Sequence, residues 1–435
     1  MSAPTRLPLA EITQLTLGYM RLSDAAPLIL AKEAGLYEHY GLDVTLHREV
    51  SWANLRDKLV VGELDAAQLL APLPMTTTFG AGGIRENLVT GLSLGLNGNA
   101  ITLSNSLWDS LDLQFPGRVP DALQVVQRLQ QQIRERGRLT FATVHAFSMH
   151  TFLLRQWFQA GQIDPDSDIR LLVLPPEQMC DSLARGIIDG FCVGEPWSTV
   201  AVEQGIGTVA ASGYQIWNNA PEKVLGVTEH WHENYPTTHL RLRLAIMEAC
   251  RLLTQPEQRV RVAELMSQKQ YLNLPVKLLL PSLTGDYRFS KNELTVHVPE
   301  FHLFWQHMAG FPWRSHAAWI VQQSSALLGK PISISDSRAL VQQSYRPNLY
   351  RDAARHLGEP SPSQDYKEEN RHGSPWEFEP GIMLGPDIMI GNPQYSGRAE
   401  AVGGVTGAVS GSLSAGVSGG TGAGSNALQR FRAIE

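Results

Sequence analysis

The chain has 435 residues, which is long enough for two or three domains. An apolar content of 43% and a charged content of 18% are typical of a soluble globular protein. The net charge of −6 argues against a nucleic-acid-binding surface that extends over the whole molecule, although local basic patches are compatible with it.

The N-terminus lacks the pattern of an exported protein. Residues 1–16 contain one arginine, two prolines and no apolar core of the kind that a secretory signal carries. No lipobox cysteine lies near the start, and no apolar run is long enough to span a membrane. We therefore expect a cytoplasmic protein without membrane insertion if the chain is complete. A receptor whose leader had been removed would show the same sequence.

Residues 15–49 predict one parallel βαβ unit. The apolar run 15–20 is suited to a buried strand, and apolar residues then recur at helical spacing over 26–37. Ser23 and Asp24 are good caps for that helix, and residues 44–46 alternate as in a half-buried strand. In such sheets, ligands bind outside the carboxyl ends of the strands, beside the following helix N-termini.

The same alternation continues and predicts two α/β lobes. The first lobe is expected over 15–99, after a short extension at 1–14, and the second over 100–224. Strands interleaved with helices predict a parallel sheet in each. The chain should return to the first lobe near residue 225, so that two crossings form a hinge that can close on a ligand.

Residues 225–350 are expected to complete the first lobe, with a mostly helical stretch from about 235 to 329. A C-terminal extension follows at 351–435, and its Gly/Ser-rich part at 403–424 is typical of a flexible tail. The scattered cysteines Cys180, Cys192 and Cys250 form no CxxC pair, so they are expected as buried free thiols. No metal or other cofactor is expected.

Two candidate ligand residues precede the second lobe. Trp52 stands at a strand-to-helix junction, where its indole N–H and flat face could serve a planar anion, or where it could simply pack in the core. Asn97-Gly98-Asn99 lies at the expected crossing between the lobes. The pair Asn97-Gly98 is a common turn, whereas the Asn99 amide could equally donate a hydrogen bond to an anion.

Two further candidates carry the cationic chemistry. His150 lies between a strand and an amphipathic helix, where free backbone N–H groups and the helix dipole favour an anion. Lys223 would supply a full positive charge where the chain returns to the first lobe. Either residue could instead have an ordinary structural role, His150 in the core and Lys223 on the surface.

Several short motifs occur in order along residues 15–285. They are D-x-A-P-L-I-x-A-K-E-x-G at 24–35, S-W-x-x-x-R-D-K-L at 51–59, A-P-L-P-M at 71–75, L-N-G at 96–98, A-G-x-I-D-P at 160–165, V-x-P-P-x-Q-M at 173–179, D-G-F-C-V-G-E-P-W at 189–197 and P-E-K-x-L-G at 221–226. In these motifs the chain resembles the type II solute-binding proteins, the cleft-shaped receptors of ABC importers, and within them the nitrate/bicarbonate-binding branch.

The resemblance implies the periplasmic-binding-protein type II fold, with two α/β lobes and a ligand cleft at a two-stranded hinge. In the family a tryptophan, a glutamine, a histidine and a lysine hold the anion. They match Trp52, His150 and Lys223, whereas the glutamine position after L-N-G is Asn99 here, which is one methylene shorter. All four side chains can donate hydrogen bonds and none is a carboxylate, which favours nitrate or nitrite over bicarbonate.

Two functions remain for this binding chemistry. The chain resembles the NasS type of cytoplasmic nitrate/nitrite sensor, which implies that it holds an RNA-binding antiterminator protein inactive until the anion closes the lobes. The alternative is the periplasmic nitrate receptor of an ABC importer. An enzyme similar to the thiamine-pyrimidine synthases is disfavoured because their cysteine cluster is absent, and no Ser-His-Asp, HExxH or P-loop pattern occurs. The carboxylate of Glu195 alone is weak evidence for acid–base catalysis.

Overall fold

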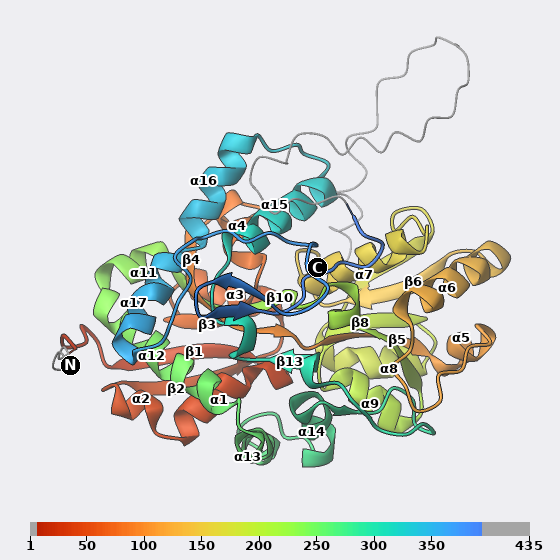
Figure 1. Cartoon of the computed structure of the whole chain (residues 1–435), viewed down its shortest axis with the longest axis horizontal. Helices are drawn as coiled ribbons and strands as arrows, with labels where there is room; N and C mark the ends of the chain where they lie inside the picture. The colour runs from red at the N-terminus through yellow and green to blue at the C-terminus, as the bar shows by residue number, and fades with distance from the viewer. Residues whose placement is uncertain (1–6, 394–435) are drawn as a thin grey trace, which may run out of the picture.

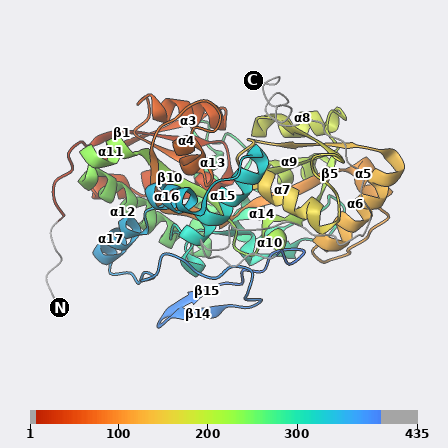
Figure 2. The same cartoon turned by 90° about the horizontal axis from the view of Figure 1, so that it is seen from above.

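The chain folds into two α/β lobes that lie side by side in the computed structural model, which describes residues 7–393 (Figures 1 and 2). The first lobe is built on a six-stranded sheet with the order β13-β4-β10-β3-β1-β2. The second is built on a five-stranded sheet with the order β7-β6-β8-β5-β9.

The strands of the first sheet are β1 Gln14–Met20, β2 Asp43–Glu49, β3 Ala66–Leu70, β4 Leu88–Asn97, β10 Pro221–Thr228 and β13 His302–Leu303. Those of the second sheet are β5 Asn99–Ser104, β6 Leu139–Thr143, β7 Ile169–Val173, β8 Gly190–Gly194 and β9 Gly207–Ser212.

Both sheets are mixed, which corrects the prediction of parallel sheets. In the first sheet β10 runs antiparallel to its neighbours β3 and β4. In the second sheet β5 runs antiparallel to β8 and β9. The reason is the connectivity: these two strands enter their sheets from the other lobe, rather than by a crossover from a neighbouring strand of the same sheet. They therefore begin at the edge where the parallel strands end, and that edge faces the other lobe.

The helices of the first lobe cover both faces of its sheet (Figure 1). They are α1 Ala26–Glu33, α2 Leu36–His39, α3 Trp52–Val60, α4 Leu73–Phe79, α11 Glu229–Asn234, α12 Pro236–Leu252, α13 Pro256–Ser267, α15 Arg314–Leu328, α16 Ile334–Ser344 and α17 Pro347–Leu357. A short 3₁₀ turn, η1 Ser23–Ala25, connects β1 to α1.

The second lobe has its own set of helices, and one further helix, α14, contacts both α13 of the first lobe and α9 of the second. They are α5 Asn105–Ser110, α6 Ala122–Arg136, α7 Met149–Ala160, α8 Met179–Ala184, α9 Trp197–Gln204, α10 Gly213–Ile216 and α14 Val276–Thr284. The 3₁₀ turn η2 Pro176–Gln178 precedes α8.

Helix starts follow the capping signals in the sequence. The Ser51 hydroxyl accepts a hydrogen bond from the backbone N–H of Asn54 at 3.1 Å and caps α3. The Ser148 hydroxyl does the same for α7, from Thr151 N–H at 3.1 Å. The sequence also predicts Ser23 and Asp24 as caps, but neither side chain makes a capping bond. Asp24 instead points to the site described below.

The two expected crossings join the lobes, although the second ends earlier than the sequence indicates. β4 runs into β5 through Gly98, whose φ of +87° is a left-handed conformation suited to glycine. The return from β9 to β10 occupies residues 213–220, so β10 begins at Pro221 rather than at residue 225. Glu222 and Lys223 therefore belong to the sheet of the first lobe.

Residues 285–313 depart from the expected helical stretch. Pro281 lies within α14, and Gly285 ends that helix with a φ of +82°. The short strands β11 Asp286–Tyr287 and β12 Val296–His297 follow. This segment packs against the second lobe, where the N–H of Val209 donates to the carbonyl of Phe289 at 2.8 Å. It thus forms an additional link between the lobes.

A C-terminal arm, residues 359–393, forms a further link. It carries the hairpin β14 Trp376–Glu379 and β15 Ile382–Leu384, which stands out on one face in Figure 2. In this arm the backbone carbonyl of Asp365 accepts a hydrogen bond from the N–H of Arg314. The carbonyl of Ile388 accepts one from the N–H of Asn218, in the 213–220 crossing, at 3.0 Å. The predicted flexible tail at 403–424 lies outside the described residues.

The apolar core is continuous across the two lobes. One cluster includes Trp52 and Leu55 of α3 together with Phe152 of α7. A second cluster fills the other face of the first sheet, against α1, α12 and α13. Cys180, Cys192 and Cys250 are buried free thiols, as the sequence predicts. Within residues 7–393 no helix is both long enough and apolar enough to cross a bilayer.

Candidate functional site

The four predicted ligand residues meet where the two lobes face each other. Trp52 is the first residue of α3, Asn99 the first of β5, His150 the second of α7, and Lys223 the third of β10. Each side chain is at most 1% exposed. Two come from each lobe, so the lobes are closed around this point.

The antiparallel strands explain why Asn99 and Lys223 reach the site. Because β5 and β10 begin at the edge that faces the other lobe, their first residues lie beside the N-termini of α3 and α7. The pairing of β10 with β4 is irregular on both sides of Lys223. This β-bulge lets the adjacent side chains of Glu222 and Lys223 contact each other, although strand alternation would separate them.

The ammonium group of Lys223 is held by two carboxylates. Its Nζ lies 2.8 Å from Oδ2 of Asp24 and also donates to Oε1 of Glu222. It stands 5.3 Å from the ring centroid of Trp52, which is within cation–π range. Lys223 is thus buried, paired and directly beside the indole.

The carboxylate of Glu222 lies at the centre of the candidate residues. Its Oε2 accepts a hydrogen bond from Nδ2 of Asn99 at 2.5 Å. Its Oε1 contacts Lys223 and lies 3.4 Å from Nε2 of His150, which is a long contact rather than a formed hydrogen bond. The expectation that the site lacks carboxylates is therefore wrong, and the argument against bicarbonate that rested on it fails.

Sequence reasoning missed Asp24, Gln68 and Glu222. Gln68 of β3 is fully buried; its amide donates to Oδ1 of Asp24 at 2.7 Å, and its Oε1 accepts from the N–H of Met20 at 3.0 Å. Gln68 thereby orients Asp24 toward Lys223. Asp24 and Glu222 both occur in the quoted motifs, but Asp24 is predicted as a helix cap and the sequence indicates no role for Glu222.

Several buried polar atoms at the site have no hydrogen-bond partner among the described residues. They are Nε1 of Trp52, both ring nitrogens of His150 and Oδ1 of Asn99. Buried polar groups in folded proteins are nearly always satisfied, so a cluster of exceptions indicates that something else completes it. Here the free groups include the indole N–H of Trp52, whose ring lies 5.3 Å from the Lys223 ammonium, and the imidazole of His150, which lies beside Glu222. That arrangement can donate hydrogen bonds to a small bound anion.

Burial and charge set the protonation states of the site. Burial lowers the pKa of His150 well below its ordinary value, and Lys223 lowers it further, so the imidazole is neutral. Burial alone would lower the pKa of Lys223, but the carboxylates of Asp24 and Glu222 outweigh it and raise that pKa. Burial raises the pKa of Glu222, although Lys223 and Asn99 act in the opposite direction.

The lobes also make direct contacts around the site. Nη1 of Arg21, after β1, lies 2.8 Å from Oε2 of Glu177 in the second lobe, and its guanidinium stacks over the Trp197 ring at 5.6 Å. The backbone N–H of Ser23 donates to the carbonyl of Glu195 at 2.7 Å. These contacts bridge the edges of the cleft.

The raised pKa of Glu195 should make the free energy of unfolding depend on pH. Its buried carboxyl, bonded to Tyr287 and Thr199, has a pKa raised by burial from 4.5 to about 7. Since the folded-state pKa is the higher one, its stabilising contribution is complete below pH 4.5 and disappears as the pH rises to about 7. The full difference is on the order of 3 kcal/mol. Urea unfolding at several pH values should show this slope, and Glu195→Gln should reduce it; identical slopes in both proteins would contradict the assignment.

A second buried ion pair, the Glu369 cluster, lies in the C-terminal arm outside the cleft. Glu369 is fully buried, contacts the Lys367 ammonium, accepts from Ser315 at 2.8 Å and lies 3.3 Å from His316. Burial raises its pKa to about 7. The cluster resembles the cleft in composition, and it offers matched control positions.

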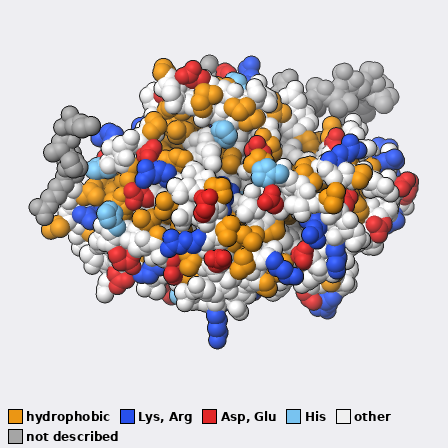
Figure 3. Space-filling model, turned by 60° about the horizontal axis from the view of Figure 1, so that its bottom comes forward, with side chains coloured by type: hydrophobic (Ala, Val, Ile, Leu, Met, Phe, Trp, Pro, Cys, Tyr) orange, Lys and Arg blue, Asp and Glu red, His pale blue; other side chains and the backbone are white. Residues whose placement is uncertain are grey.

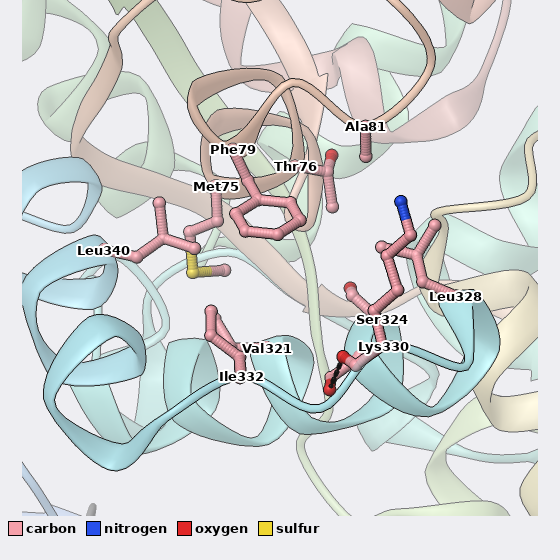
Figure 4. Close-up of a pocket in the computed structure, with 11 residues that line it drawn as sticks. Met75, Thr76, Phe79, Ala81, Val321, Ser324, Leu328, Lys330, Ile332 and Leu340 are labelled. Carbon is pink, nitrogen blue, oxygen red and sulfur yellow. Dashed lines mark hydrogen bonds between the residues drawn. The ribbon is translucent and has the colours of Figure 1, made fainter.

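Other features of the surface lack the chemistry of the cleft. A small apolar pocket lies between α4 and the α15–α16 pair, and Figure 4 shows Met75, Phe79, Val321 and Leu340 pointing into it. On the face shown in Figure 3, lysine and arginine side chains are interspersed with acidic ones. Within residues 7–393 no group of three or more His, Cys, Asp or Glu side chains is placed to hold a metal ion.

Comparison with known proteins identifies the relatives of this chain. A family model described as the NMT1-like family matches residues 9–267. The nitrate import ATP-binding protein NrtC of Synechocystis is 36% identical over 360 residues, which cover 82% of this chain and 52% of that protein. The bicarbonate-binding protein CmpA of Synechococcus elongatus is 30% identical over 391 residues, covering 87% of this chain and 85% of CmpA.

The nitrate/nitrite binding protein NrtA of Synechocystis is similar in both sequence and structure. It is 31% identical over 359 residues, covering 81% of this chain and 78% of NrtA. Its crystal structure, described as that of a periplasmic nitrate-binding protein, superposes with a TM-score of 0.79 at 27% identity over 91% of this chain and 98% of NrtA. The expected type II fold is thereby confirmed. The chain spans about half the length of NrtC and most of NrtA.

Proposed function

The chain belongs to the NMT1-like family of solute-binding proteins, in the branch of the nitrate and bicarbonate ABC transporters, and from this premise we propose that it binds nitrate or nitrite between its lobes. The family is one of binding proteins rather than enzymes. The proposed ligand residues are Trp52, Asn99, His150 and Lys223.

One observation carries the proposal: unpaired buried hydrogen-bonding groups surround a buried ammonium. The indole of Trp52 and the imidazole of His150 have no hydrogen-bond partner among residues 7–393. Trp52 lies beside Lys223, and His150 lies beside the Glu222 carboxylate that Lys223 contacts. Nitrate and nitrite accept hydrogen bonds and donate none, so they suit this set. The Glu222 carboxylate could accept the O–H of bicarbonate, which keeps bicarbonate as the alternative ligand.

Titration calorimetry with nitrate, nitrite, bicarbonate and sulfate tests the proposal. We expect nitrate or nitrite to bind in the micromolar range, which corresponds to about −8 kcal/mol and is within reach of a few charge-assisted bonds. Binding of bicarbonate alone would shift the assignment to the alternative. No heat with any of these anions would overturn the proposal.

The role that the relatives favour is that of a receptor delivering the anion to an ABC importer. NrtA and CmpA are named as binding proteins, and the chain covers 78% of NrtA and 85% of CmpA. In such a receptor the closed lobes present the form that the transporter recognises. Stimulation of ATP hydrolysis by the cognate transporter, dependent on nitrate, would support this role; its absence would count against it.

The second candidate is an anion-dependent regulator. One relative, NrtC, is named as an ATP-binding protein, and the chain matches only 52% of it, so domains of this kind also occur within longer polypeptides. In this version the protein is cytoplasmic, and its open form holds an RNA-binding antiterminator protein. Size-exclusion chromatography with such a protein should show a complex that nitrate dissociates. A complex that is indifferent to nitrate, or exclusive recovery of the protein from the periplasm, would reject this candidate.

The contact between Arg21 and Glu177 should contribute to affinity because it forms only between closed lobes. Glu177 is partly exposed, so the ion pair is worth at most about 1 kcal/mol. Glu177→Gln is therefore expected to weaken nitrate binding up to about fivefold at low salt, with a smaller difference at high salt. Asp181→Asn, which removes an ion pair to Arg185 within one lobe, should leave affinity unchanged. Equal effects of the two substitutions would show that the mouth contact has no special role.

A further inference from the structure

The donors of the site already hold an anion that belongs to the protein. The carboxylate of Glu222 is planar and negatively charged, and its oxygens accept hydrogen bonds from Asn99 and Lys223, two of the four proposed nitrate ligands. His150 lies 3.4 Å away and forms no hydrogen bond to it. Glu222 is only 2% exposed, so water does not replace these contacts. The side chain therefore occupies two of the donors that an incoming oxoanion needs, those of Asn99 and Lys223.

Charge makes simultaneous occupancy unfavourable. With both carboxyls ionised, Asp24, Glu222 and Lys223 together carry one negative charge, and the buried imidazole of His150 adds none. A bound nitrate would raise this to two negative charges in a buried site, which is costly unless a charge is neutralised. Two further titratable neighbours stay neutral. Burial raises the pKa of the Cys192 thiol of β8, and burial, Arg259 and Lys223 lower the pKa of His302 of β13.

We propose that Glu222 is an internal competitor for the anion site, and that binding of nitrate is coupled to uptake of one proton from solvent by the Glu222 carboxyl. The proton converts the carboxylate into a neutral acid, which releases Lys223 and Asn99 and leaves the total charge of the site unchanged. The O–H that forms is a further donor for the anion. This inference rests on the proposed function and identifies how the same site is regulated.

The contacts of the two carboxyls explain why Glu222, and not Asp24, takes up that proton. Asp24 has its second oxygen occupied by Gln68 at 2.7 Å and stays paired with Lys223. Burial raises the pKa of Glu222, which favours its protonated form relative to an exposed carboxyl. Asp24 thus serves as the fixed counter-ion of Lys223, while Glu222 exchanges between two states.

Calorimetry in buffers of different ionisation enthalpy counts the protons that accompany nitrate binding. The wild-type protein should take up close to one proton per nitrate at pH 8.5, and fewer as the pH falls and Glu222 is already protonated. Its nitrate affinity should decrease by up to tenfold per pH unit above the pKa of Glu222. Glu222→Gln should bind nitrate without proton uptake, independently of pH between 6 and 9, and at least tenfold more tightly than wild type at pH 8.5.

Glu369→Gln is the matched control, because Glu369 is equally buried beside a lysine and a histidine but lies outside the cleft. It should keep the wild-type proton count. Wild-type binding without proton exchange between pH 6 and 9 would overturn the inference even if Glu222→Gln failed to fold. An unchanged pH profile in a folded Glu222→Gln protein would do the same. Absence of any anion binding would instead reject the proposed function, and the inference with it.

Discussion

Replacing Lys223 with methionine is expected to abolish nitrate binding and to lower the free energy of unfolding by about 3–5 kcal/mol. The loss of binding follows because Lys223 supplies the positive charge among the proposed ligand residues. The loss of stability follows because Asp24 and Glu222, both buried, would be left without their cation. Titration calorimetry and urea unfolding measure the two effects separately.

Lys367→Met provides the control for this substitution. Lys367 is paired with the buried carboxylate of Glu369 in the C-terminal arm, so its removal should also destabilise the protein. Nitrate affinity should nevertheless remain within about twofold of wild type, since a change of that size is under 0.5 kcal/mol. If Lys223→Met retained nitrate binding, or if Lys367→Met abolished it, the charge at the proposed site would not lie where we place it.

Replacing Trp52 with phenylalanine should weaken nitrate binding by about tenfold or more. Its effect on the free energy of unfolding should be much smaller than its effect on the free energy of binding. The indole N–H has no acceptor among residues 7–393, so its removal breaks no internal hydrogen bond. A hydrogen bond to a charged group contributes about 1.5–3 kcal/mol, which corresponds to tenfold or more in affinity. Calorimetry gives the affinity, and urea unfolding gives the stability.

Trp157→Phe should give the opposite pattern. The indole of Trp157 is buried and donates to the carbonyl of Ala122 at 2.7 Å, so its removal leaves a buried acceptor unpaired. Stability should fall by about 1–3 kcal/mol while nitrate affinity stays close to wild type. The same pattern for both tryptophans would mean that Trp52 serves only to pack the core.

Local signals in the sequence were sufficient to predict most of the scaffold. The strand–helix–strand unit at 15–49 forms as β1, α1–α2 and β2, and the Ser51 cap marks the start of α3. Tertiary effects were harder to predict. The direction of β5 and β10 depends on which lobe the chain arrives from, and alternating hydrophobicity carries no information about that.

The residues of the site were predicted only in part, because their contacts also depend on tertiary structure. Trp52, Asn99, His150 and Lys223 lie together in the structure, and their role as nitrate ligands stays a prediction. Glu222 was missed because the chain was expected to return to the first lobe only near residue 225, whereas β10 begins at Pro221 and the Glu222 carboxylate contacts Lys223. Asp24 was assigned to a helix cap, whereas its carboxylate accepts from Gln68 and Lys223.

Each proposed ligand residue occupies one of the first three positions of its helix or strand, a feature with consequences for how such a protein can diversify. The caps that start α3 and α7 belong to Ser51 and Ser148, not to the residues that face the cleft. Point substitutions at positions 52, 99 and 150 can therefore exchange donors for acceptors while the scaffold keeps its own starting signals. A lineage could acquire a new cargo in this way without rebuilding either lobe.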